Sequence, residues 1–145
     1  MRRFRFNLEK LLELRELRER KAEMELAEKA GRCAVLEAEL DENARSRART
    51  AREMFAPGRG IDDFRAAELF MVRLDRERER ILEELAAAEL EREKARAVYV
   101  EKHAEAEAMR KIKERRQVEY YRLAAREETK ALDDLARRRV AGAEG

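Results

Sequence analysis

The stretch Ala56-Pro57-Gly58-Arg59-Gly60 is the one place in this sequence where a helix has to stop. It contains the only proline and two of the five glycines. Proline inside a helix costs about 3 kcal/mol, and glycine readily adopts the positive φ angles that a tight reversal needs. The chain has a helical pattern on both sides of this stretch. The sequence therefore predicts an all-α fold, in which two long helices of unequal length form an antiparallel coiled-coil hairpin.

The composition favours a thin helical fold over a globular one. Charged residues make up 47% of the chain, there is no tryptophan, and the mean hydropathy is -0.84. Too little apolar material is left for a thick core. The apolar residues recur at spacings of three and four, and the polar residues are mainly Glu, Arg and Lys, which are good helix formers. This pattern favours a coiled coil over a disordered chain.

The charge pattern and the single cysteine indicate a protein of the cytoplasm. The 35 basic and 33 acidic residues are interleaved, whereas a nucleic-acid-binding protein would carry a stripe of one sign, so no nucleic acid is expected as a partner. Cys33 alone cannot form an intrachain disulfide, and no apolar run reaches the length of a membrane span. The basic residues before Phe6 are followed at once by glutamates, unlike a transit peptide.

The lengths of the two helices are expected to differ. We predict a single domain over residues 1–145, with a first helix at about 4–55, a turn at 56–61 and a second helix at about 62–140. With a reversal at Pro57, Phe4 would lie opposite Glu114, so the chain after about residue 115 would overhang without a partner. An isolated polar helix is marginally stable in water. This end is therefore expected either to fray or to bind another protein.

No constellation of residues indicates catalysis. His103 is the only histidine, which argues against a His-based triad and excludes a His-rich metal site. Gly58-Arg59-Gly60 lacks the Lys-Ser/Thr of a phosphate-binding loop. We therefore expect no catalytic residue, no metal, no cofactor and no small-molecule ligand, and we predict that the chain is not an enzyme.

Both ends of the chain resemble one family. The segment from Phe4 to Glu16 resembles the opening F-x-F-x-L-x-x-L-L-x-L-R-E of the flagellar export protein FliJ family. The segment from Arg126 to Ala136 is similar to that family's closing pattern, R-x-E-x-x-x-(L/M)-D-E-(F/L)-A. The central turn, the unequal helices and the length also match, so the resemblance spans the whole chain.

The resemblance implies a stalk-like, non-enzymatic component of the flagellar type III export apparatus, monomeric when alone and peripheral to the inner membrane. It implies three partners: the hexameric export ATPase FliI, whose assembly and activity the stalk would promote, the cytoplasmic domain of the export gate protein FlhA, and export chaperones. The ATPase-binding residues would be Phe4, Phe6, Leu8, Leu11, Arg15, Tyr120, Leu123, Arg126, Leu132, Asp133 and Leu135. The gate-binding residues would be Leu40, Phe70 and Leu74, although the tyrosines of the family's gate patch are absent here.

Two other classes of function stay open. The chain could be a structural coiled-coil tether that self-associates through the segment from Tyr120 to Leu135. It could also bind a polyanion or a membrane surface through its basic end, which includes Arg137 to Arg139, and such binding would weaken strongly with salt.

Overall fold

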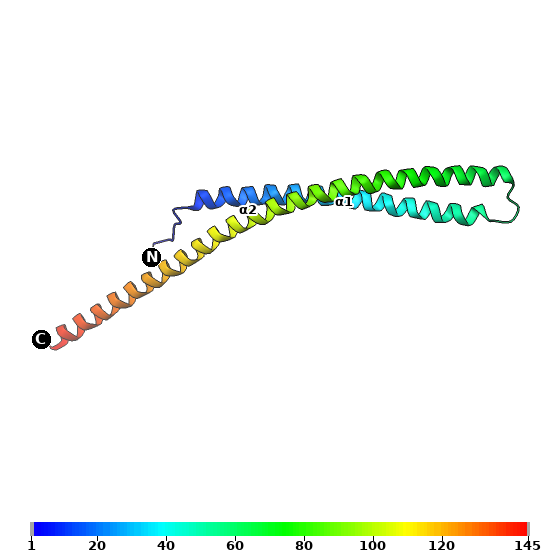
Figure 1. Cartoon of the computed structure of the whole chain (residues 1–145). Helices are drawn as coiled ribbons and strands as arrows, with labels where there is room; N and C mark the ends of the chain where they lie inside the picture. The colour runs from blue at the N-terminus through cyan, green and yellow to red at the C-terminus, as the bar shows by residue number, and fades with distance from the viewer. Residues whose placement is uncertain (1, 145) are drawn as a thin grey trace. The chain divides into compact units, whose positions relative to one another are not determined.

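The structure, a computed structural model, describes residues 2–144 and contains two α-helices joined by a short loop (Figure 1). Helix α1 spans Glu9–Met54 and has 46 residues, and helix α2 spans Ile61–Glu144 and has 84 residues. No strand occurs within residues 2–144. The predicted all-α fold with two helices of unequal length is confirmed.

The loop between the helices contains the expected proline and glycines. Gly58 has a φ angle of 86°, a conformation that L side chains rarely adopt. Gly60 precedes α2, and its N–H donates a hydrogen bond to the carboxylate of Asp63 at 3.3 Å. Its carbonyl accepts the N–H of Phe64 at 3.1 Å. These two bonds satisfy backbone groups that a helix start would otherwise leave unpaired.

The chain is divided into two compact units. The turn unit is Arg20–Val100, and the terminal unit consists of residues 2–19 and 101–144.

In the turn unit, α1 and α2 are antiparallel and bury a narrow seam. Three polar contacts show the antiparallel pairing. Arg32 contacts Glu84, whereas Asn43 and Arg47, which come later in α1, contact Leu74 and Asp75, which come earlier in α2. The most buried side chains between these contacts are Cys33, Leu36 and Ile81. Apolar side chains at the helical spacing of three or four residues thus form a two-helix core, as in other coiled coils.

Asn43 is a polar residue inside this seam. It is only 5% exposed, and its Nδ2 donates to the carbonyl oxygen of Leu74 at 3.0 Å, while its Oδ1 has no hydrogen-bond partner within residues 2–144. A buried asparagine in a coiled coil fixes the register of the helices at a cost in stability. We infer that Asn43 holds α1 and α2 in this pairing.

The terminal unit differs from the expectation in where its elements begin and end. The first helix starts at Glu9 and not near residue 4, because residues 2–8 follow a non-helical path against α2, which we call the N-terminal strap (Figure 1). Burial of Phe6 and a bond from Tyr120 to the Arg2 carbonyl hold this path. Helix α2 continues past residue 140 to Glu144, through a segment that has alanines and no proline.

The unpartnered part of α2 also begins later than expected. The strap extends beyond the start of α1, and it contacts Arg116 and Tyr120 of α2. Beyond Tyr120, every residue up to Glu144 is exposed except Ala124, which is half-buried. We call residues 121–144 the free end of α2. It starts about five residues after the predicted position.

Candidate protein-interaction site

The strap packs its aromatic side chains onto α2. Phe6 is 8% exposed and forms a cluster with Leu12 and Met109, against which Phe4, Leu8 and Ile112 pack. The rings of Phe4 and Tyr120 have centroids 5.5 Å apart. The resemblance assigns Phe4, Phe6 and Leu8 to ATPase binding. In the structure these three side chains make contacts inside the terminal unit. They fix the strap on α2.

Polar groups of α2 hold the same strap along its length. The hydroxyl of Tyr120 donates to the carbonyl oxygen of Arg2 at 2.8 Å, and Nη1 of Arg116 donates to Oδ1 of Asn7 at 2.7 Å. The guanidinium of Arg116 also lies 5.7 Å from the centroid of the Phe6 ring, within range of a cation–π interaction. These contacts determine where the strap stops covering α2, which is at Tyr120.

Within the terminal unit, a cluster of charged side chains joins α1 to α2 near Glu19, the last residue of the unit's first segment. The Glu19 carboxylate, whose side chain is 13% exposed, accepts a hydrogen bond from Nη2 of Arg110 at 2.6 Å. Nδ1 of His103 lies 2.8 Å from the same carboxylate. The bond from Arg110, with a smaller contribution from His103, lowers the pKa of Glu19, and the bond to Glu19 raises the pKa of Arg110. Nearby, Arg15 donates to the carbonyl oxygen of Glu105 at 3.3 Å.

We expect Glu19→Gln to lower the free energy of unfolding at neutral pH by about 1–2 kcal/mol, because a charge-assisted bond to Arg110 is lost. The pKa of Glu19 in the folded protein lies below its ordinary value of 4.5. Its stabilising contribution is therefore present above pH 4.5 and is lost as the pH falls through the folded-state pKa. Urea unfolding of both proteins at neutral and at acidic pH checks this, with Glu13→Gln as the exposed control. A difference in unfolding free energy between the two proteins that stays constant with pH would contradict this prediction.

The free end of α2 presents apolar side chains to solvent. Leu132 and Leu135 are 66% and 56% exposed, and Tyr121 and Leu123 are also exposed. Tyr121, Leu132 and Leu135 are spaced so that they lie near one face of the helix. Arg126 and Asp133, both assigned to ATPase binding by the resemblance, are exposed on the same segment. A second helix packed on this face would bury Leu132 and Leu135.

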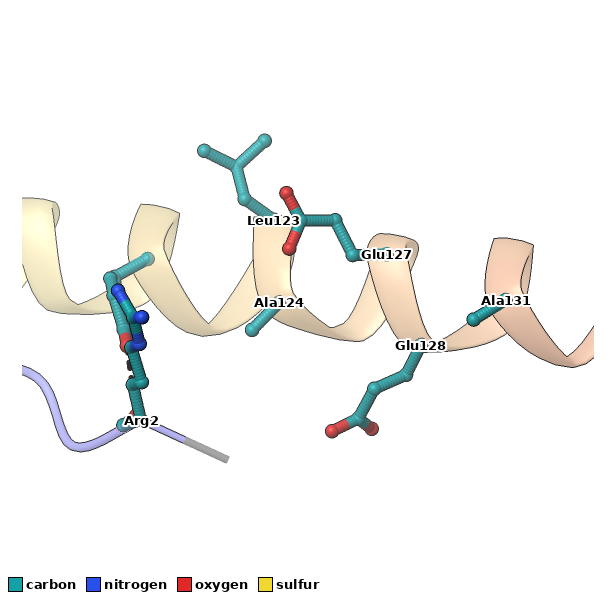
Figure 2. A pocket seen from close by; sticks show the side chains of 7 residues that line it. Arg2, Leu123, Ala124, Glu127, Glu128 and Ala131 are labelled. Atoms are coloured by element: carbon teal, nitrogen blue, oxygen red, sulfur yellow. Dashed lines mark hydrogen bonds between the residues drawn. The ribbon is translucent and has the colours of Figure 1, made fainter.

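A shallow groove of about 460 Å³ lies where the strap ends and the free end begins (Figure 2). It is lined by Arg2, Tyr120, Leu123, Ala124, Glu127, Glu128 and Ala131. In Figure 2, Leu123 and Glu128 project from opposite sides of α2. All the lining residues except Arg2 belong to this one helix, so the groove is a surface contour that suits a packed helix and not an enclosed ligand cavity.

The other assigned residues lie in different surroundings. Leu11 is exposed on α1 of the terminal unit. In the turn unit, Leu74 is 5% exposed and belongs to the seam, Leu40 is half-buried, and Phe70 is exposed. A partner could reach Phe70 directly, but it could not reach Leu74 while α1 and α2 remain paired.

Sequence reasoning missed two basic residues of α2 that hold the start of α1 and the strap. Lys113 and Arg116 occupy seam positions of α2, where charged residues normally indicate a weak coiled coil. In the structure, Lys113 pairs with Glu9 at 2.8 Å and Arg116 bonds to Asn7. The antiparallel count gave no signal for these pairs, because Phe4 opposite Glu114 would place Glu9 and Asn7 opposite Met109 and Lys111, about four or five residues before their actual partners.

Residues 2–144 contain neither a candidate metal-binding cluster nor a candidate membrane-spanning helix. No group of three or more His, Cys, Asp or Glu side chains is placed to hold a metal ion. Neither helix, over the part of the chain that is described, has an apolar stretch of the length needed to cross a bilayer.

The fold and these surfaces define a coiled-coil hairpin protein whose exposed features suit contact with other proteins. The family model described as flagellar FliJ protein matches residues 4–145, which is essentially the whole chain. The chain belongs to the FliJ family, and it is therefore a component of flagellar export. No curated protein and no solved structure gave a match.

Proposed function

We propose that this protein is a non-enzymatic stalk that inserts the free end of α2 into the hexameric export ATPase and promotes assembly and activity of the ring. One observation carries the proposal: residues 121–144 continue as a helix in which every residue except Ala124 is exposed, including Leu123, Leu132 and Leu135. Membership of the FliJ family supplies the export context.

The energetics favour a partner for this segment. Isolated polar helices are marginal in water, because most helical stability in proteins comes from burial of one face. Full burial of a leucine side chain contributes about 1.5–3 kcal/mol. Burial of the free-end leucines in the central hole of a ring would therefore stabilise both the helix and the assembled ring.

The turn unit provides the second contact in this proposal. Phe70 would bind the cytoplasmic domain of the export gate protein, and Leu40 and Leu74 would support it from the seam, since Phe70 is the exposed member of the three. Binding of the gate would place the protein at the inner membrane as a peripheral component. Export chaperones would bind the same stalk.

The direct experiment mixes the purified protein with the purified export ATPase of the same organism and measures ATP hydrolysis. We expect hydrolysis to rise with added protein and to saturate as rings form. A protein lacking residues 123–145 keeps Tyr120 and the strap contacts, and it should give no increase. An equal increase with the shortened protein would contradict the proposal.

Self-association through the free end is the competing function, because the same exposed leucines could pair with a second copy. Light scattering at increasing protein concentration distinguishes the stalk proposal from self-association. The stalk proposal predicts a monomer at all concentrations, whereas a tether predicts a dimer that disappears when residues 123–145 are removed.

A further inference from the structure

One face of α2 in the terminal unit carries four basic side chains of the same sign. Lys111, Arg115, Arg122 and Arg126 are separated by four, seven and four residues, which places them in one row along the helix. All four are exposed. The row, which we call the basic stripe, is about 22 Å long at 1.5 Å per residue.

The members of the basic stripe differ from their basic neighbours because they have no acidic partner. None of the four forms an ion pair within residues 2–144, whereas Arg110 and Lys113 in the same stretch pair with acidic residues of α1. Residues 110–126 contain seven basic and two acidic residues, while Arg20–Val100 contains 17 basic and 19 acidic ones. The interleaving of charge that argues against polyanion binding therefore does not hold on this face.

The chemistry of the stripe favours a flat anionic surface over a protein partner. Protein interfaces usually have an apolar centre, but Val118 is the only large apolar side chain within the row. A straight row of long, flexible cations can instead contact a planar array of phosphate groups along its whole length. Glu114 and Glu119 border the row and reduce its potential, so the attraction should be moderate and sensitive to salt.

We propose that the basic stripe adsorbs the terminal unit to the surface of a bilayer that contains anionic phospholipid. The contact is electrostatic and needs no insertion of apolar side chains. Each basic residue near such a surface contributes about 1 kcal/mol, which corresponds to about a fivefold change in binding. Adsorption by the stripe requires neither the ATPase nor the leucines of the free end.

Co-sedimentation of the full chain with lipid vesicles tests this proposal. Vesicles of phosphatidylcholine mixed with phosphatidylglycerol should bind the protein, and vesicles of phosphatidylcholine alone should not. The variant Lys111→Gln, Arg115→Gln and Arg122→Gln should bind the anionic vesicles about 100-fold more weakly, as expected for three charges. Added salt should release the wild-type protein.

The matched control replaces three exposed basic residues of the turn unit that lack ion pairs there, Arg65→Gln, Arg73→Gln and Arg76→Gln. It should bind like the wild type, which shows that position matters and not total charge. Circular dichroism confirms that both variants remain helical. Three results would overturn the proposal: no binding to anionic vesicles, an equal loss in the control, or stripe-dependent binding to poly-glutamate without any binding to vesicles. Because Arg122 belongs to the free end that the proposed function places in the ATPase, stimulation of the ATPase is measured with the double variant Lys111→Gln and Arg115→Gln. This variant should lose vesicle binding and keep full stimulation, so failure of the stripe and failure of the proposed function are distinguishable.

Discussion

The double variant Leu132→Asp and Leu135→Asp is expected to abolish stimulation of the export ATPase while leaving the fold intact. Both side chains are more than half exposed in the free protein, so the substitutions should change neither the helix content nor the melting temperature by much. In the proposed complex the same positions become buried. An unpaired buried carboxylate costs several kcal/mol, so affinity should fall by about a thousandfold or more.

The control applies the same change to equally exposed leucines of the turn unit. Leu69 and Leu90 are 72% and 58% exposed, and Leu69→Asp with Leu90→Asp should leave stimulation unchanged. ATP hydrolysis across a titration of each protein measures the effect. Full stimulation by the free-end variant, or equal loss by both variants, would show that the free end is not the surface that binds the ATPase.

Ile81→Asp is expected to unfold the turn unit. Ile81 is 0% exposed in a seam that is only two helices thick, so no second layer of side chains compensates for its loss. Truncation of a buried isoleucine typically costs 2–5 kcal/mol, and a buried carboxylate adds to that. The whole stability of a small domain is about 5–15 kcal/mol.

Thermal melting followed by circular dichroism checks this prediction. Leu82 is the neighbouring residue in the sequence but is 38% exposed, and Leu82→Asp should lower the melting temperature only slightly. Similar melting of the two variants would contradict the seam assigned to the turn unit.

The reversal of the chain was predictable because the physics at that point is local. Pro57 and Gly58 act through the backbone of a few residues, and neither depends on what lies far away in the sequence. The buried seam was predictable for a similar reason, since its apolar residues repeat with the period of a coiled coil. Cys33 and Ile81 lie in that seam as the spacing predicts.

The strap was not predictable from the same rules. Phe4 and Leu8 are four residues apart, a spacing that fits a helix as well as a non-helical segment packed on another helix. What decides between them is distant in sequence: the hydroxyl of Tyr120 and the guanidinium of Arg116. The start of the free end depends on the strap, so the predicted overhang was about five residues too long.

The candidate site was predictable only in part. The exposure of Leu132 and Leu135 followed from the unequal lengths of the helices. Leu74 lies in the seam as the coiled-coil spacing predicts, like Ile81 seven residues later. The inward packing of Phe6 did not follow, because a family motif names residue types and not the directions in which side chains point.

Site-specific photocrosslinking along α2 tests the central claim most directly. A photoreactive amino acid is placed singly at exposed positions of the free end, such as Leu123, Leu132 and Leu135, and at exposed positions of the turn unit, such as Leu69 and Leu90. Irradiation with the assembled export ATPase should give crosslinks to the ATPase from the free-end positions and none from the turn-unit positions. Crosslinks to the ATPase from the turn unit alone would contradict the account.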